Sequence, residues 1–250
     1  MMTLKERLLG GEGILATWLT VASPAIGELL GLTGFGCVAI DAEHGAIDLG
    51  EAENLIRAVE AGGAAPLLRV AGLDQVLIKR ALDLGPAGVI IPLVSTREAA
   101  EAAVRFAKYP PQGVRGVGVG RAQAYGLDLA GYLGRANREG LVVVQVEDRG
   151  ALQNLDEILS VPGVDMVFIG PVDLSTSLGF PGQPDHPVVD EANARVLAAA
   201  KAAGRLAGIH ASDATVARRR LEQGFRLVTV ATDTVLLARA GQAVLTQVRG

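Results

Sequence analysis

The sequence has little of what extracellular and membrane proteins depend on. Its 250 residues contain one cysteine, Cys37, so no internal disulfide framework can form, and a reducing cytoplasm is the expected location. No apolar run reaches the ~18 residues of a membrane span. The N-terminal stretch 1–13 reads as a short charged helix without the apolar core of a signal peptide. A net charge of −4 gives no general reason to expect nucleic acid or an anionic membrane as partner.

Two kinds of functional element are also missing. No Gly-rich nucleotide loop follows the first apolar run, which disfavours a doubly wound open sheet, the main alternative fold. Schiff-base enzymes built on a barrel need a lysine at the end of a strand. The lysines of this chain fall on predicted helices or directly after one, and none ends a predicted strand: Lys5, Lys79, Lys108 and Lys201. Covalent lysine chemistry is therefore disfavoured.

What the sequence does contain is a repeated alternation of short apolar runs and helical patterns. The runs predicted as strands are 14–19, 38–41, 65–70, 88–92, 141–147, 166–170, 206–210 and 227–231. The predicted helices are 23–32, 48–61, 74–84, 96–107, 151–159, 190–203, 214–223 and 234–248. Eight βα units in an unbroken chain indicate a single (β/α)8 TIM barrel, one α/β domain spanning 1–250.

Two predicted connections are longer than the others. They cover 109–128 and 171–187, and both would lie over the C-terminal face of the barrel, where active sites are built. Variable surface loops are the simpler interpretation. Long connections without secondary structure of their own are usually functional, however, and we expect these to be.

Polar residues stand at the C-terminal ends of most predicted strands, so they should meet at one face. They are Trp18, Asp41, Glu43, His44, Arg69, Gln145, Glu147, Asp173, His210 and Asp233. Glu147 and Asp173 offer only hard oxygen ligands, which favours Mg²⁺ or Mn²⁺ over zinc. Two solvated acids at the barrel rim are the alternative interpretation.

Three of these residues suggest roles in proton transfer and charge stabilisation. His44 lies in sequence beside Asp41, whose carboxylate could orient the imidazole as a general base; a structural histidine is the alternative. Arg69 could stabilise an enolate or hold a carboxylate, or form only a rim salt bridge. His210 could be a third metal ligand, but a residue lining the pocket is favoured because two acids already suffice for an oxygen site.

Several motifs occur in an order that resembles a known family. DAEHG at 41–45, Arg69, YPPQGVRGVG at 109–118, QVE at 145–147, GPVDLS at 170–175 and DTVLLARA at 233–240 are similar to the HpcH/HpaI family of metal-dependent (class II) pyruvate aldolases. The resemblance covers essentially the whole chain. It implies a TIM barrel with Mg²⁺, Mn²⁺ or Co²⁺ at Glu147 and Asp173. Gln145 and the backbone amide of Val172 would contact pyruvate, with His44 as base and Arg69 at the enolate oxygen.

The resemblance also implies an assembly. It matches Asp83, in ALDLG, to an acid that supports the base histidine from a neighbouring subunit, in a homo-oligomer expected to be a hexamer. Asp83 ends a predicted helix at the bottom of the barrel, too far from the top face of its own chain. The sequence departs from the family pattern at His210, where an apolar residue is expected, and in the segment 120–125.

The expected function is reversible cleavage of a 4-hydroxy-2-oxo acid to pyruvate, or a close analogue such as hydroxypyruvate, and an aldehyde. Trp18 and His210 would line the substrate pocket, and Asp41 and Asp83 would assist His44. One alternative is a citrate-lyase-β-like enzyme acting on an acyl-CoA ester, although no basic patch for an adenine nucleotide is evident. A non-catalytic barrel that binds keto acids is the other.

Overall fold

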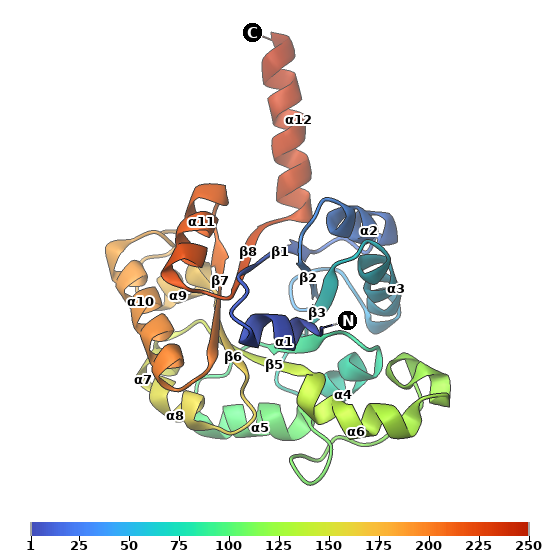
Figure 1. Cartoon of the computed structure of the whole chain (residues 1–250). Helices are drawn as coiled ribbons and strands as arrows, with labels where there is room; N and C mark the ends of the chain where they lie inside the picture. Colours follow the sequence, from blue (N-terminus) through green and yellow to red (C-terminus); the bar gives the residue numbers. More distant parts are fainter. Residues whose placement is uncertain (1, 250) are drawn as a thin grey trace.

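The strands of this protein close into a barrel with helices outside it (Figure 1). The computed structural model describes residues 2–249. Each strand pairs in parallel with its neighbours in chain order, and β8 pairs with β1 to complete the ring. The strands are β1 (Ile14–Leu19), β2 (Cys37–Asp41), β3 (Ala65–Arg69), β4 (Gly88–Ile91), β5 (Leu141–Val146), β6 (Met166–Ile169), β7 (Leu206–Ala211) and β8 (Leu227–Thr232). The predicted TIM barrel is confirmed.

Helices follow most strands, and most of them cover the outside of the barrel (Figure 1). They are α1 (Leu4–Leu9), α2 (Pro24–Leu32), α3 (Leu49–Ala61), α4 (Gln75–Asp83), α5 (Arg97–Ala107), α6 (Leu129–Glu139), α7 (Arg149–Gln153), α8 (Leu155–Ser160), α9 (Pro171–Ser177), α10 (Pro187–Ala202), α11 (Ala214–Gln223) and α12 (Asp233–Arg249), with a 3₁₀ segment η1 (Arg121–Gly126). Among residues 2–249, no helix combines the length and apolarity needed to cross a membrane.

The helices differ from the predictions in several places. η1 was not predicted, and α10 begins at Pro187, three residues before the predicted start at 190. Asn154 divides the predicted helix 151–159 into α7 and α8, because its backbone leaves the helical region (φ −99°, ψ 15°). α6 was not predicted. The segment 171–187, predicted to be a loop, begins instead with helix α9, whose first position is Pro171. Proline suits this position because its φ is already helical and no N–H is needed there.

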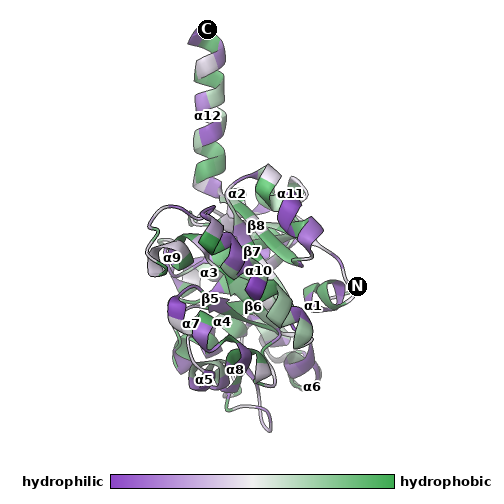
Figure 2. Ribbon diagram, turned by 90° about the vertical axis from the view of Figure 1, so that its left-hand side faces the viewer, coloured by the Kyte–Doolittle hydropathy of each residue, from purple (hydrophilic) through white to green (hydrophobic). Residues whose placement is uncertain are grey.

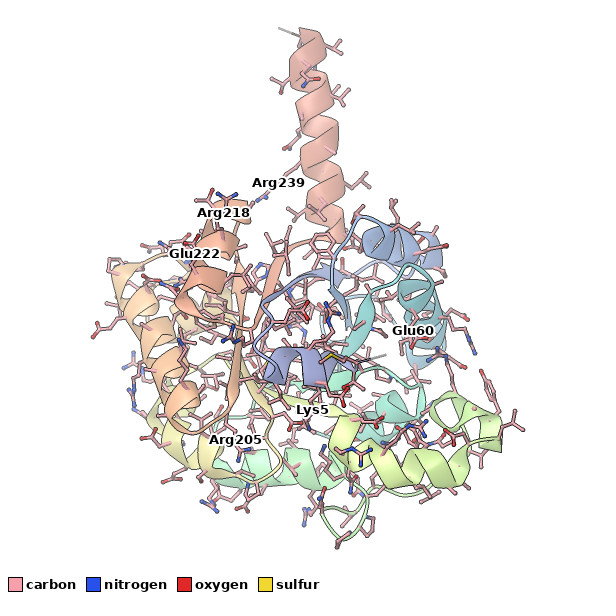
Figure 3. All side chains as sticks on the ribbon, viewed as in Figure 1. Lys5, Glu60, Arg205, Arg218, Glu222 and Arg239 are labelled. Carbon is pink, nitrogen blue, oxygen red and sulfur yellow. The ribbon has the colours of Figure 1, made fainter. Side chains whose placement is uncertain are left out.

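The core has two layers that follow from the alternation of side chains along each strand. One layer fills the barrel; the ring centroids of Trp18 and Phe168 lie 5.9 Å apart near its C-terminal end. The other lies between strands and helices. α1 closes the bottom of the barrel, where Lys5 forms a salt bridge of 2.7 Å with Asp165 (Figure 3).

Helix α12 does not pack along the barrel but projects away from it (Figures 1 and 2). Its base is fixed by Asp233, a buried acid that accepts hydrogen bonds from the backbone N–H groups of Thr20 (3.1 Å) and Val21 (2.9 Å). Beyond this base most of its apolar side chains are exposed, with Leu237 at 71% and Val248 at 81%. On the outer face of β1, Leu15 is 39% exposed. Both the helix and this part of the barrel wall therefore present apolar surface.

Candidate active site

A cavity of about 290 Å³ opens at the C-terminal end of the strands. Its lining residues come from both halves of the chain: Trp18, Asp41, His44, Arg69, Gln145, Phe168, Gly170, Pro171, Val172, Asp173, His210 and Thr232. The residues predicted to bind metal or substrate or to act in catalysis all line this cavity except Glu147, which is buried beside it, and Asp83. Glu43 and Asp233, which were also expected at this face, do not line it. Side chains at the C-terminal ends of different strands therefore lie together at one face, as expected for parallel strands in a barrel.

Asp41 and Arg69 form a buried two-point pair. Nε of Arg69 donates to Oδ1 of Asp41 at 2.9 Å, and Nη2 donates to Oδ2 at 2.7 Å. The two residues are partners in the β2–β3 register, which places them side by side. Burial opposes ionisation of Asp41, but the hydrogen bonds and positive charge of Arg69 outweigh it and lower the pKa of this carboxyl. The pair thus fixes the guanidinium.

The predicted contact between Asp41 and the imidazole of His44 is not made. Asp41 instead accepts from the backbone N–H groups of Glu43 (3.1 Å) and His44 (3.2 Å), which holds the turn. The acid nearest the ring is Glu43, with its Oε2 at 3.8 Å from Nε2 of His44. Adjacency in sequence suggested the wrong acid, because Asp41 is occupied by Arg69. The His44 side chain is 67% exposed at the mouth of the cavity.

Arg69 is held on two further sides. Its Nη1 lies 3.2 Å from Oε2 of Glu43, and its Cζ lies 4.4 Å from the centre of the Trp18 ring. Burial raises the pKa of Glu43 despite the nearby Arg69 charge. A guanidinium fixed in this way faces the cavity with little conformational freedom to lose when it binds an anion.

Three polar side chains converge on Gly170, from β5, from the residue directly after it and from α9. A Cβ atom at this glycine would lie 3.2 Å from Oδ2 of Asp173, 3.2 Å from Nε2 of Gln145 and 3.6 Å from Oε2 of Glu147. Any residue with a side chain would therefore fill the space among these groups. Gly170 had not been predicted as part of the site; its place directly before the PVD segment was the available signal.

The protein orients the Glu147 side chain, but its surroundings disfavour the ionised carboxylate. Its Oε1 accepts from the backbone N–H of Leu93 at 2.8 Å, and Oε2 accepts from Gln145 Nε2. Leu93 has a positive φ of 59°, a strained conformation that had no sequence signal. Burial raises the pKa of Glu147, and the charges of Glu43 and Asp173 raise it further. A bound cation would stabilise the ionised carboxylate and reduce this repulsion.

The donor set fits a hard divalent cation. Glu147 and Asp173 supply carboxylate oxygens on either side of Gly170, and Gln145 Oε1 is buried without a hydrogen-bond partner among residues 2–249. No group of three or more His, Cys, Asp or Glu side chains in the described chain could hold a metal. A cation here would thus complete its shell with water and substrate, as Mg²⁺ commonly does.

Val172 and Asp173 lie in the first turn of α9, not in a loop. The N–H of Val172 belongs to the first turn, whose amides have no acceptor within the helix. Asp173 also complements the positive end of the helix dipole. The backbone amide of Val172, whose side chain lines the cavity, is therefore available to a ligand.

Asp83 lies away from this cavity, at the C-terminal end of α4. Its Oδ1 accepts from Nη2 of Arg115 at 2.7 Å, and its side chain is 23% exposed. Arg115 lines a separate cavity with Ala87 and Leu141, which begin or precede strands, so Asp83 belongs to the opposite end of the barrel. As expected, it does not contact the site of its own chain. Arg115 is part of the segment 109–128, which was expected over the C-terminal face; that expectation was wrong here, because the segment follows helix α5 and not strand β4 directly.

Comparison with known proteins agrees with this geometry. The sequence profile of the family "HpcH/HpaI aldolase/citrate lyase" matches residues 15–240. A hydroxypyruvate/pyruvate aldolase from Pseudomonas aeruginosa is 41% identical over 94% of this chain and 88% of that protein. A 4-hydroxy-2-oxo-heptane-1,7-dioate aldolase from Shigella flexneri is 38% identical, covering 96% and 91%. A crystal structure of an HpcH/HpaI aldolase/citrate lyase family protein from Burkholderia cenocepacia J2315 superposes with a TM-score of 0.94 at 40% identity, over 99% of both chains. This chain belongs to the HpcH/HpaI aldolase/citrate lyase family.

Proposed function

We propose that this protein is a divalent-metal-dependent aldolase. It cleaves a 4-hydroxy-2-oxo acid to pyruvate, or a hydroxylated analogue such as hydroxypyruvate, and an aldehyde. The observation that carries the proposal is the convergence of Glu147, Asp173 and Gln145 on Gly170, in the same cavity as the fixed guanidinium of Arg69. Relatives named as pyruvate aldolases support the substrate class.

Glu147 and Asp173 are the residues that would hold Mg²⁺, Mn²⁺ or Co²⁺. When bound, the cation supplies positive charge that polarises the 2-oxo group and favours the enolate. Gln145 and the backbone N–H of Val172 hold the carboxylate end of the 2-oxo acid. Arg69 stabilises the negative charge that develops on the enolate oxygen, and its pairing with Asp41 keeps it in place for this purpose.

His44 is the general base in the cleavage direction. It takes the proton of the 4-hydroxyl group, the C3–C4 bond breaks, and the electron pair of that bond forms the enolate. The aldehyde leaves, and protonation at C3 gives the 2-oxo acid. His44 lies at the mouth of the cavity, within reach of a bound substrate, and Oε2 of Glu43 lies 3.8 Å from its Nε2.

The chain acts as a homo-oligomer in which Asp83 completes the site of a neighbouring subunit, expected in a hexamer. Two features support an assembly. α12 and the outer face of β1 both present exposed apolar side chains, among them Leu15 and Leu237. Asp83 is partly exposed at the opposite end of the barrel from its own site, and thus accessible to another copy. A cytoplasmic location is consistent with the single, buried Cys37.

The test is an aldol and retro-aldol assay with pyruvate and a panel of aldehydes, with and without Mg²⁺, Mn²⁺ or Co²⁺. We expect product only with added metal, and none in the Glu147→Gln variant. Glu157→Gln, which changes an exposed acid on α8, is the matched control. Full activity in excess chelator would refute the proposal. Binding of 2-oxo acids without turnover would identify a non-catalytic barrel.

A further inference from the structure

A short hydrogen-bonded chain crosses the top of the barrel interior beneath the site. Nε1 of Trp18 on β1 donates to Oγ1 of Thr229 on β8, at 3.0 Å. The same Oγ1 lies 3.0 Å from Nδ1 of His210 on β7. His210 and Thr229 are partners in the β7–β8 register, so the contact is fixed by the sheet. Thr229 is 0% exposed.

The position of Trp18 determines which nitrogen of His210 carries the proton. Indole N–H can only donate, so Trp18 occupies a lone pair of the Thr229 hydroxyl. In the described chain, Thr229 Oγ1 makes no hydrogen bond besides these two. If Nδ1 of His210 also donated, the hydroxyl proton would be buried without an acceptor, at a cost of about 1–3 kcal/mol. Thr229 therefore donates to Nδ1, and the proton of a neutral ring is on Nε2.

The ring also borders the active-site cavity. His210 lines the active-site cavity and also a smaller space of about 70 Å³ beside it. Its Nε2 has no hydrogen-bond partner among residues 2–249. Burial, with a smaller effect from the Arg69 charge, lowers the pKa of His210 to about 4. At neutral pH the ring is thus uncharged and presents a single N–H donor to the cavity.

We propose that His210 is a specificity-determining hydrogen-bond donor that selects substrates carrying a hydroxyl group beyond the 2-oxo acid unit, and that Thr229 and Trp18 are positioning residues that hold its Nε2–H tautomer. The inference rests on the proposed function. Arg69, Gln145 and Val172 already bind the oxygens of the 2-oxo acid. The N–H of His210 can therefore donate to an additional oxygen of the substrate. A substrate with a methyl group there leaves the N–H unpaired, which penalises it relative to the hydroxylated one.

The hydroxyl could belong to either reactant, and paired substrates separate the two sources. Hydroxypyruvate and pyruvate are compared with one aldehyde that lacks a hydroxyl group. Glycolaldehyde and acetaldehyde are compared with pyruvate as the common partner. We expect the wild type to prefer the hydroxylated member in at least one pair, and that pair identifies the reactant that His210 contacts. No preference in either pair would overturn the proposal.

Variants then test the residues. His210→Phe keeps an aromatic ring but removes the N–H donor. In the preferred pair, it should lower the ratio of kcat/KM for the hydroxylated substrate to kcat/KM for the methyl substrate about tenfold, equivalent to about 1.4 kcal/mol. Thr229→Val should lower the same ratio, and Thr229→Ser should restore it. Thr17→Val removes a buried hydroxyl on the outer face of β1 and should leave kcat/KM for both substrates of the pair unchanged. A ratio unaltered by His210→Phe would refute the assignment.

The tautomer can be measured without activity. The chain has three histidines, and His210 is assigned by the loss of its signals in His210→Phe. Solid-state NMR of the sedimented protein, labelled with ¹⁵N histidine, should show a neutral ring protonated on Nε2 at neutral pH. Protonation on Nδ1 would overturn the argument. If no substrate pair reacts with any metal, the proposed function fails and substrate selection with it, while the NMR result still decides the tautomer.

Discussion

Arg69 and Asp41 meet through two parallel hydrogen bonds between neighbouring strands, and this pair defines the direction of the guanidinium. Arg69→Lys should lower kcat/KM by ~10²-fold or more, because an ammonium cannot reproduce the fork. It should also lower the free energy of unfolding by about 1–3 kcal/mol, since Asp41 and Glu43 lose a partner. Kinetics and chemical denaturation test both effects. Arg97→Lys, in an exposed pair with Glu101, is the control, and wild-type kcat/KM in Arg69→Lys would contradict the prediction.

Glu147→Gln should abolish activity but raise the stability of the metal-free protein. The raised pKa of Glu147 means that the folded state binds a proton more readily than the unfolded state, so its contribution to stability is lost as pH rises through the raised pKa. At neutral pH without metal, the variant should therefore unfold at a higher temperature than the wild type. Metal should stabilise only the wild type. Thermal unfolding with and without Mn²⁺ measures this; equal stabilisation of both proteins by Mn²⁺ would argue against Glu147 as a ligand.

His44→Ala should lower kcat by ~10²–10⁴-fold, the usual contribution of a positioned general base. Metal affinity should change little, because His44 pairs with Glu43 and not with the two acids near Gly170. Titration calorimetry with Mn²⁺ separates the two effects. Loss of metal binding would show that His44 is a ligand instead.

His210 should make the protein sensitive to mild acid. As pH falls below 6.5, the unfolded chain protonates this histidine, whereas the folded protein resists protonation until about 4. The unfolded state thus binds more protons in this window, and stability falls with pH. The free energy of unfolding of His210→Phe should therefore decline less steeply between these pH values. Parallel curves for the two proteins would exclude His210 as the cause.

Mixing two inactive variants tests whether subunits share a site. Asp83→Asn and His44→Ala chains should each have low activity, and co-assembly should restore part of it, because some sites then pair an intact His44 with an intact Asp83. A purely structural role of Asp83, through its salt bridge with Arg115, would give no recovery. Activity is measured after joint refolding. A fully active monomer would contradict the shared site.

The sequence predicted the strands well because their apolar, β-branched runs have no other stable location. Each predicted strand differs from the structure by at most one residue at either end. The helix α9 was missed because it has only seven residues, too few to show apolar periodicity. The division at Asn154 was missed because both flanking segments continue the helical pattern.

It was harder to predict which residues of the site contact one another than which residues belong to it. Asp41 was expected to contact His44, three residues away, but strand register places Arg69 beside it. Register also joins His210 to Thr229, which carried no motif. The sequence also does not show which surface the exposed apolar side chains of α12 cover. These relationships depend on pairing between distant segments, and one sequence contains no direct signal of that pairing.

Trp18 is the one tryptophan in the chain, and it lies under Arg69 and against Phe168 at the floor of the cavity. Its fluorescence, excited at the red edge where tyrosine does not absorb, therefore comes entirely from the active site. A ligand that moves Arg69 or changes the hydrogen bond to Thr229 will alter the emission. The protein thus carries an intrinsic optical probe, with which the binding of 2-oxo acids can be followed directly in the absence of any aldehyde and without a coupled assay.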